Sequence, residues 1–217
     1  MDNQAGARQP YRIVTPPPAA TMACKRAFDI LCSFLGLAVL SPVLLVVSVL
    51  VAVTSPGGVF FRQERIGKDG KPFRIFKFRS MRKDNAGLKI TTGNDSRITP
   101  VGRFLRKSKI DELPQLINVL VGDMSFVGPR PEVADYVNLY TPYQRQVLLV
   151  RPGITGLASI RFRNENDLLT ASDDPNRTYI EQIMPRKIDL DLEYIPHASV
   201  FYDIKLIFQT FAVVIKE

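Results

Sequence analysis

Two adjacent carboxylates in the middle of the chain are the residues best suited to chemistry. Asp111 and Glu112 open a predicted helix and follow a basic cluster. The cluster consists of Arg103, Arg106, Lys107 and Lys109. A helix N-terminus offers free N–H groups and a partial positive charge, which keep a carboxylate ionised and attract phosphate. Such a carboxylate can attack phosphorus to form an acyl phosphate, or it can bind Mg²⁺ that bridges a diphosphate. The simpler interpretation is that the pair only caps the helix.

Two arginines in turn-forming sequences could bind the phosphates of such a substrate. Arg130 lies between Pro129 and Pro131, and a rigid backbone lowers the entropy lost when a guanidinium holds a phosphate. Arg151 precedes residues 152–156 (Pro-Gly-Ile-Thr-Gly), whose glycine amides could approach an anion. Either segment could instead serve only as a turn.

Other kinds of chemistry have less support in the sequence. Asp189 and Asp191 have the spacing of the metal-binding acids in many nucleotide-sugar glycosyltransferases, but nothing before them resembles a nucleotide-binding α/β domain. His197 is the only histidine, which argues against a mechanism that needs a histidine base. Cys24 and Cys32 lie at or inside an apolar segment, where we expect small buried hydrophobic side chains rather than a disulfide or a metal site.

An apolar segment must place these residues relative to a lipid bilayer. Residues 30–61 contain no charged side chain over 32 consecutive positions. A helix of 24 residues reaches about 36 Å, enough to cross a hydrocarbon core of about 30 Å. Ser41 and Pro42 lie in the middle of the run, and proline removes a backbone donor. We therefore predict a helix break at Ser41-Pro42.

The charges on both sides of the apolar segment suggest its topology. The preceding cations are Arg12, Lys25 and Arg26, and the following ones are Arg62, Arg65, Lys68 and Lys71. Because cationic flanks stay on the cytoplasmic side, the pattern favours a re-entrant helix-break-helix that enters and leaves by the same face. A simple spanning helix is the alternative.

The charge distribution indicates an anionic partner. The net charge is +8, and residues 62–109 carry 15 Lys and Arg against 4 Asp and Glu. Beside a membrane segment, such a block favours anionic membrane lipids or other phosphates. A solvated basic face is the simpler alternative. No nucleic-acid recognition motif appears, so we do not expect nucleic acid as a partner.

The remaining pattern predicts a mostly α fold with a small β-hairpin. We divide the chain into a flexible tail (1–21), the membrane segment (22–56) and a compact catalytic domain on the cytoplasmic face (57–217). Residues 59–61 and 73–78 have the composition of a hairpin, and residues 84–100 that of a loop.

Helical spacing recurs along the catalytic domain. The first such stretch runs from 104 to 120 and is interrupted near Ser108-Lys109, with Asp111 as a cap, Pro114 in the next turn and Gly122 as the C-terminal cap. Further helices are predicted at 136–150 and at 177–195, the latter interrupted by Pro185. The apolar stripe at 204–215 either packs in the core or lies as an amphipathic helix in the membrane interface.

Several long motifs, in this order, resemble the monotopic phosphoglycosyl transferases, the bacterial sugar transferases that start glycan assembly on undecaprenyl phosphate. The matching stretches are residues 25–29 before the apolar helix, 61–67 (Phe-Arg-Gln-Glu-Arg-Ile-Gly), 72–81, 111–118, 122–131 and 151–156. Many members of the family continue the last stretch with Trp-Ala-Gln and an Asn-Gly-Arg run, whereas here residues 157–164 read Leu-Ala-Ser-Ile-Arg-Phe-Arg-Asn. We therefore infer no sugar specificity from the resemblance.

The resemblance implies a mechanism. Asp111 would be the nucleophile and Glu112 its partner. Asp111 would attack the sugar-linked phosphate of a UDP-sugar, UMP would leave, and polyprenyl phosphate would take the phospho-sugar from Asp111. Mg²⁺ would lie near Asp111 and neutralise the diphosphate, while Arg106 and Arg130 would bind phosphates. The expected location is the bacterial inner membrane, and the resemblance leaves open whether the chain forms a homodimer.

A non-enzymatic alternative remains on the sequence alone. A membrane-anchored basic module that binds acidic lipid or a protein partner would explain the charge and the apolar segment. It would give no reason for Asp111-Glu112 beside the Pro-Arg-Pro segment that contains Arg130.

Overall fold

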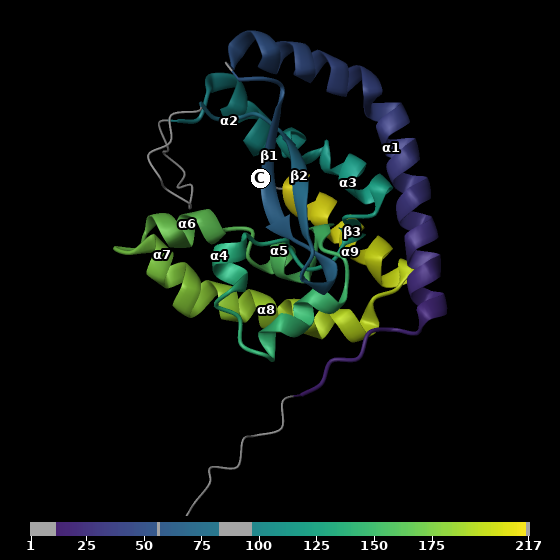
Figure 1. Ribbon diagram of the computed structural model, residues 1–217. Coiled ribbons are helices and arrows are strands. Elements are labelled where there is room, and N and C mark those ends of the chain that lie inside the picture. Colours follow the sequence, from purple (N-terminus) through teal and green to yellow (C-terminus); the bar gives the residue numbers. More distant parts are fainter. Residues whose placement is uncertain (1–11, 56, 83–96, 216–217) are drawn as a thin grey trace, which may run out of the picture.

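The computed structural model describes residues 12–55, 57–82 and 97–215. The fold is mostly helical, with a small antiparallel hairpin and one long apolar N-terminal helix, as predicted (Figure 1). Residues 1–11 of the predicted tail and most of the predicted loop at 84–100 lie outside the described residues.

The described residues form α-helices, short strands and short 3₁₀ or π turns. The α-helices are α1 (Ala19–Thr54), α2 (Pro100–Lys107), α3 (Gln115–Val121), α4 (Ala134–Val137), α5 (Leu157–Arg161), α6 (Glu165–Thr170), α7 (Pro175–Thr178), α8 (Met184–Tyr194) and α9 (Val200–Ile215). The strands are β1 (Phe60–Ile66), β2 (Pro72–Phe78), β3 (Ser125–Val127) and β4 (Gly153–Thr155). Short 3₁₀ or π turns join them: η1 (Lys68–Gly70), η2 (Ile110–Glu112), η3 (Gln144–Leu149), η4 (Tyr179–Ile183) and η5 (Ile195–His197).

Helix α1 curves around one side of the molecule (Figure 1). It is a single helix of 36 residues with Pro42 inside it, so the predicted break at Ser41-Pro42 is replaced by a continuous, bent helix. Both residues are exposed, and the Ser41 hydroxyl donates to the Ala38 carbonyl at 2.8 Å. This bond occupies a carbonyl at the point where proline supplies no N–H, which lets the helix continue through the bend.

Both ends of α1 bury side chains against the rest of the chain, while its middle buries none. Near the N-terminal end, Asp29 and Ser33 are buried, and near the C-terminal end Val47 and Val51 are buried. No side chain from 34 to 46 is buried. Only 11% of the most hydrophobic 18-residue window of α1 is buried. By length and composition this helix could cross a membrane.

Two of the seven cations on which the topology prediction relied, Lys25 and Arg26, have structural roles. Lys25 is buried and forms an ion pair with Asp203 of α9. Arg26 donates to the carbonyls of Val119 and Leu120, at 2.5 and 2.9 Å, at the C-terminal end of α3. Both contacts connect α1 to the catalytic domain, so these two charges do not count as free cations facing lipid.

The residues before α1 are packed where the structure describes them. Residues 12–18 have no regular secondary structure, and Val14 is buried in the main core. Its N–H donates to Oε1 of Gln146 at 2.7 Å, and Nε2 of Gln146 donates to the Arg12 carbonyl. This part of the predicted tail therefore belongs to the folded domain.

The hairpin has the predicted position and is longer than predicted. Strands β1 and β2 pair antiparallel from Phe60↔Phe78 to Ile66↔Pro72. The tight η1 turn joins them, and Asp69 lies there in the left-handed region at φ 57°. Strand β2 packs against α3, and Phe78 joins Val47 and Val51 in a small core beneath the C-terminal end of α1.

The segment from 100 to 122 departs in part from the predicted helix pair. The interruption lies where the sequence placed it, because Lys109 has φ 57°. Asp111 and Glu112 lie in η2, and α3 begins only at Gln115 after Pro114. Asp111 therefore does not cap the second helix, whereas Gly122 ends it at φ 101° as predicted.

The sequence reasoning missed a second, parallel pairing. Strand β3 pairs with β4 through Ser125↔Gly153 and Val127↔Thr155. Glycines allow the backbones to approach: a side chain on Gly153 would lie 2.2 Å from the Gly128 nitrogen. The N–H groups of Gly128 and Gly153 donate to Thr155 and Pro129 carbonyls. Their amides are therefore used within the fold rather than offered to an anion.

The C-terminal half forms the largest core. The predicted helix at 136–150 is instead two short pieces, α4 and η3, separated by irregular backbone. The predicted interruption near Pro185 is present, since the π turn η4 precedes Pro185 at the start of α8. Helix α9 buries Leu206 and Asp203 but exposes Phe201, Phe208 and Phe211.

Candidate active site

Asp111 is a nearly buried carboxylate to which no described residue is bonded. Its residue is 7% exposed, and no hydrogen bond or ion pair is found for its side chain within the part of the chain that the structure describes. Burial and the neighbouring Glu112 charge raise the pKa of Asp111 above its ordinary value, against the opposing fields of Lys77, Arg106 and Lys109. A desolvated carboxylate that forms no bonds keeps its lone pairs available for an electrophile.

Glu112 is in the opposite situation. Its Oε1 accepts from the Lys77 ammonium at 2.7 Å and from the Arg130 guanidinium at 2.9 Å. Burial alone would raise the pKa of Glu112, but Arg130 and Lys77 outweigh burial and hold that pKa well below its ordinary range. Glu112 therefore stays ionised at neutral pH and is not available as a proton donor.

Cations outnumber carboxylates around this pair. Lys77, Arg106, Lys109 and Arg130 act on two carboxylates, those of Asp111 and Glu112. The Arg130 side chain is 37% exposed, so its remaining N–H groups can reach a ligand. Such an excess of positive charge at a partly buried surface favours a multiply charged anion such as a diphosphate.

The structure brings three of the predicted site residues together around Asp111. Glu112 is its neighbour in η2, Arg130 bonds to Glu112, and Arg106 contributes to the electric field at Asp111. Arg106 lies in the last turn of α2, where its guanidinium contacts the Met81 sulfur at 3.4 Å. Among the residues that the structure describes, this weak contact is the one side-chain hydrogen bond of Arg106, so most of its donors have no partner there.

Arg151 occupies a different environment. Its Nε donates to the Gly122 carbonyl at 2.7 Å, at the end of α3. Burial lowers the pKa of the nearby Arg26, and the positive charge of Arg151 lowers it further. This contact stabilises the turn that leads from α3 into β3. Arg151 as a phosphate ligand stays a prediction.

Lys77 is a site residue that the sequence reasoning did not single out. Residue 77 lies in the motif stretch 72–81. The alternation of side chains along β2 is the one feature of the sequence that indicates which face Lys77 occupies. Its position depends on Asn118, whose side chain is fully buried. Asn118 accepts from the Phe76 N–H at 2.8 Å and donates to the Arg74 carbonyl at 3.0 Å. The amide thereby fixes β2 on α3, and so fixes Lys77 relative to Glu112.

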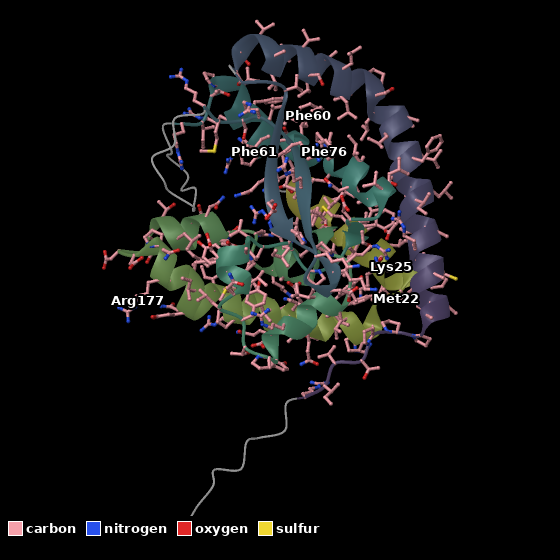
Figure 2. All side chains as sticks on the ribbon, in the orientation of Figure 1. Met22, Lys25, Phe60, Phe61, Phe76 and Arg177 are labelled. Carbon is pink, nitrogen blue, oxygen red and sulfur yellow. The ribbon has the colours of Figure 1, made fainter. Side chains whose placement is uncertain are left out.

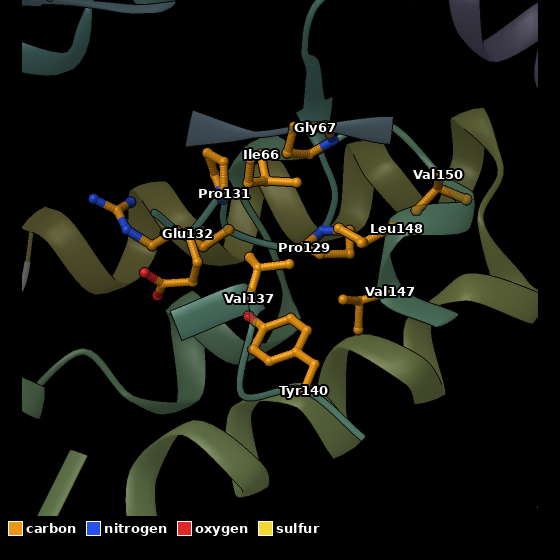
Figure 3. A pocket seen from close by; sticks show the side chains of 12 residues that line it. Ile66, Gly67, Pro129, Pro131, Glu132, Val137, Tyr140, Val147, Leu148 and Val150 are labelled. Carbon is orange, nitrogen blue, oxygen red and sulfur yellow. The ribbon is translucent and has the colours of Figure 1, made fainter. Parts of the chain in front are cut away.

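The Pro-Arg-Pro segment is held from behind. The Ile66 N–H donates to the Glu132 carbonyl at 2.9 Å, and Arg65 donates to the Pro131 carbonyl at 3.2 Å. A small pocket lies beneath this segment, lined largely by apolar side chains such as Val137, Tyr140 and Val147 (Figure 3). Its volume of about 20 Å³ has room for about one water molecule, which excludes it as a substrate site.

Asp191 is buried near the same segment. Burial raises its pKa to about 7, against the fields of Lys187 and of the Ala158 and Arg130 backbone N–H groups. Asp189 and Asp191 belong to no metal-binding group, because no set of three or more His, Cys, Asp or Glu suited to a metal occurs in the described ranges 12–55, 57–82 and 97–215. Asp191 therefore supports the backbone around Arg130.

Comparison with known proteins finds relatives that match nearly the whole chain. The family model described as bacterial sugar transferase matches residues 20–217. A UDP-glucose:undecaprenyl-phosphate glucose-1-phosphate transferase of Escherichia coli (strain K12) is 43% identical over 202 residues, which are 90% of this chain and 41% of that protein. The Rhizobium leguminosarum exopolysaccharide production protein PSS is 41% identical over 199 residues, 87% of this chain and 94% of that protein.

A third relative uses a different sugar. The UDP-N-acetylgalactosamine-undecaprenyl-phosphate N-acetylgalactosaminephosphotransferase of Aeromonas hydrophila is 40% identical over 191 residues, 86% of this chain and 42% of that protein. The chain spans about two fifths of the length of this relative and of the Escherichia coli protein. Relatives of similar identity thus bear names with different sugars.

Proposed function

The chain belongs to the bacterial sugar transferase family, and we propose that it transfers a phospho-sugar from a UDP-sugar to undecaprenyl phosphate. The main support for this proposal is the difference between two neighbouring carboxylates of η2 in how they are paired. Asp111 is nearly buried and uncommitted, and beside it Glu112 is clamped by Lys77 and Arg130. The relatives' names supply the two substrates. We assign the reaction to the first membrane step of exopolysaccharide or related glycan synthesis.

The reaction proceeds in two displacements at one phosphorus. A carboxylate oxygen of Asp111 attacks the sugar-linked phosphorus of the UDP-sugar, the bond to the bridging oxygen breaks, and UMP leaves with that electron pair. A phosphate oxygen of undecaprenyl phosphate then attacks the same phosphorus, and the Asp111 carboxylate leaves. Each step forms one P–O bond and breaks one, so the carboxylate is regenerated.

The neighbouring residues stabilise the charge that passes through this site. Arg130 and Arg106 have donors available for the phosphoryl oxygens, and Lys77 adds a fixed positive charge. Glu112 keeps Lys77 and Arg130 oriented. Because the two substrates present phosphate to the same pocket in turn, one set of cations serves both steps.

Mg²⁺ fits the donor set that the described residues offer. Asp111 has two uncommitted carboxylate oxygens, and Mg²⁺ is commonly held by one or two carboxylates together with substrate phosphates rather than by a protein cage. Glu112 is a poorer ligand because Lys77 and Arg130 occupy it. When bound, the ion would neutralise diphosphate charge.

The packing of α1 supports a re-entrant topology. The stretch between the buried Ser33 and the buried Val47 contains 13 residues and reaches about 20 Å, short of a hydrocarbon core of about 30 Å. Both ends contact the same domain, through α3 and α9 at one end and through Leu105 and Phe78 at the other. We therefore propose that α1 dips into the inner membrane and returns, with the active site on the cytoplasmic face.

Labelling from outside the cell tests this topology. A cysteine introduced in residues 12–18, in a background without Cys24 and Cys32, should resist an impermeant thiol reagent in intact cells and react after lysis. Labelling in intact cells would show that α1 spans the membrane.

The function itself is tested by product release. The full chain with Mg²⁺, undecaprenyl phosphate and a panel of UDP-sugars should release UMP and form a lipid-linked sugar diphosphate with at least one sugar. Binding to anionic vesicles without UMP release from any UDP-sugar would favour the membrane-anchored binding module instead.

A further inference from the structure

One aromatic residue stands beside the cationic site without a place in the core. Phe61 of β1 lies directly opposite Lys77 of β2, so both side chains point to the same face of the hairpin, with Cβ atoms about 5 Å apart. Lys77 bonds to Glu112 from this face. The Phe61 ring therefore lies within reach of a phosphate bound at the site.

The neighbouring phenylalanine provides a natural comparison. Phe60 is exposed to a similar extent, 38% against 42% for Phe61, but it points to the other face and stacks on Phe78 with ring centroids 5.6 Å apart. No ring contact is found for Phe61 among the described residues, and it joins none of their hydrophobic clusters. Phe60 therefore packs within the fold, whereas the Phe61 ring packs on no ring or apolar cluster of the described residues (Figure 2).

The face of the hairpin that carries Phe61 also carries Arg65 and, on β2, Phe73, Ile75 and Lys77. Phe61 lies at the end next to α1, since Gly57-Gly58 separates β1 from that helix and Val59 packs with Val47 and Val51. At the other end of the same face, Arg65 donates to the Pro131 carbonyl. The exposed Phe61 ring thus lies at the end of this face that is next to α1, opposite Lys77 of the cationic site.

Given the proposed function, we propose that Phe61 is a binding residue for the polyprenyl acceptor and covers the isoprene units next to its phosphate. An amphiphile that enters from the α1 side would place its phosphate among Lys77, Arg106 and Arg130 and its first apolar carbons on Phe61. Burial of that ring against hydrocarbon is favourable.

A single introduced indole tests this assignment without relying on catalysis. The chain contains no tryptophan, so Phe61→Trp in the full chain, held in phosphatidylcholine vesicles, reports its own surroundings alone. We expect undecaprenyl phosphate to shift the emission to the blue, whereas UDP and inorganic phosphate do not. The matched control Phe60→Trp should show no shift with any of the three.

Several outcomes would overturn the proposal. A shift with UDP would make Phe61 a platform for the nucleobase, an equal shift in both variants would indicate a general membrane effect, and no shift would leave the ring without a ligand. Because binding is read directly, a shift with undecaprenyl phosphate in a protein that releases no UMP would reject the proposed function and keep the acceptor site.

Kinetics of the separate half-reactions provide the second test. Phe61→Ala should raise KM for undecaprenyl phosphate about tenfold, the effect of losing roughly 50 Å² of apolar contact. The UMP burst without acceptor should keep its rate and amplitude, and Phe61→Leu should recover most of the affinity. A slower burst with an unchanged acceptor KM would contradict the assignment.

Discussion

Two polar clusters in this molecule are built from similar groups and differ in how completely those groups are paired. At the N-terminal end of α1, Lys25 forms an ion pair with Asp203 and also donates to Ser125 Oγ at 2.6 Å and to the Val127 carbonyl at 3.1 Å (Figure 2). Tyr194 completes the cluster by donating to Asp203 at 2.7 Å. We call these residues the helix-base cluster.

Around η2, the corresponding groups are only partly paired. Glu112 is bound by Lys77 and Arg130, but Asp111 is uncommitted and Arg130 remains 37% exposed. A buried network in which every donor and acceptor is used stabilises a fold. A cluster that keeps a carboxylate and several N–H groups unused costs stability and is typical of a site for a ligand. The predictions below test this difference.

The largest loss of stability should come from opening the helix-base cluster. Lys25→Met leaves the Asp203 carboxylate buried without its cation, which should lower the free energy of unfolding by about 3–5 kcal/mol. Thermal and chemical unfolding in detergent measure the change. The double variant with Asp203→Asn should recover much of the loss, because no buried charge is then left alone.

The helix-base cluster should contribute little to the chemistry itself. The UMP burst per folded molecule should therefore stay near that of the wild type in Lys25→Met. A burst that falls far more than the folded fraction would mean that the two clusters are coupled.

A smaller change in free energy is expected at Glu112. Glu112→Gln keeps the shape of the side chain but removes the charge that orients Lys77 and Arg130, so kcat should fall about 10²-fold, while stability changes less than in Lys25→Met. Steady-state UMP release and unfolding of the same preparation measure both. Near-normal turnover would reduce Glu112 to a structural residue of η2.

The smallest effect concerns the pH dependence. Burial raises the pKa of Asp111, and the nucleophile must be ionised, so activity should be lost as pH falls through that raised pKa, at a higher pH than for an ordinary aspartate. Lys109 lowers this pKa. Lys109→Gln should therefore move the acid limb of the pH–rate profile to slightly higher pH, most clearly at low salt.

Lys107 provides the matched control for this shift. Both lysines are exposed, but Lys107 is not among the groups with the largest effects on the pKa of Asp111. Lys107→Gln should leave the acid limb in place. Equal shifts in the two variants would indicate that net charge, rather than proximity to Asp111, controls the profile.

The sequence predicted the local features of this molecule better than the distant ones. The hairpin, the interruption at Lys109 and the cap at Gly122 follow from backbone preferences of neighbouring residues. The β3–β4 pair was missed because each strand has three residues, too few for an alternating pattern. The helix expected at 136–150 is absent because its apolar residues lie in two short elements, α4 and η3, and η3 packs on α8.

The candidate site shows the same limit. Asp111, Glu112 and Arg130 were recognisable because carboxylates and an arginine stand in distinctive local sequences. The pairing of Lys77 with Glu112 joins residues 35 positions apart, and that of Lys25 with Asp203 joins residues 178 positions apart. Neither pairing has a local signal. For this reason Lys25 was interpreted as a membrane-flanking cation and Lys77 was not singled out.

The covalent step is the centre of this account, and mass spectrometry of the intact protein tests it most directly. After brief exposure to the accepted UDP-sugar without undecaprenyl phosphate, the wild-type chain should gain the mass of one phospho-sugar, mapped to the peptide that contains Asp111. Asp111→Asn should remain folded and gain no such mass. The same adduct in Asp111→Asn, or an adduct mapped to another peptide, would contradict the account.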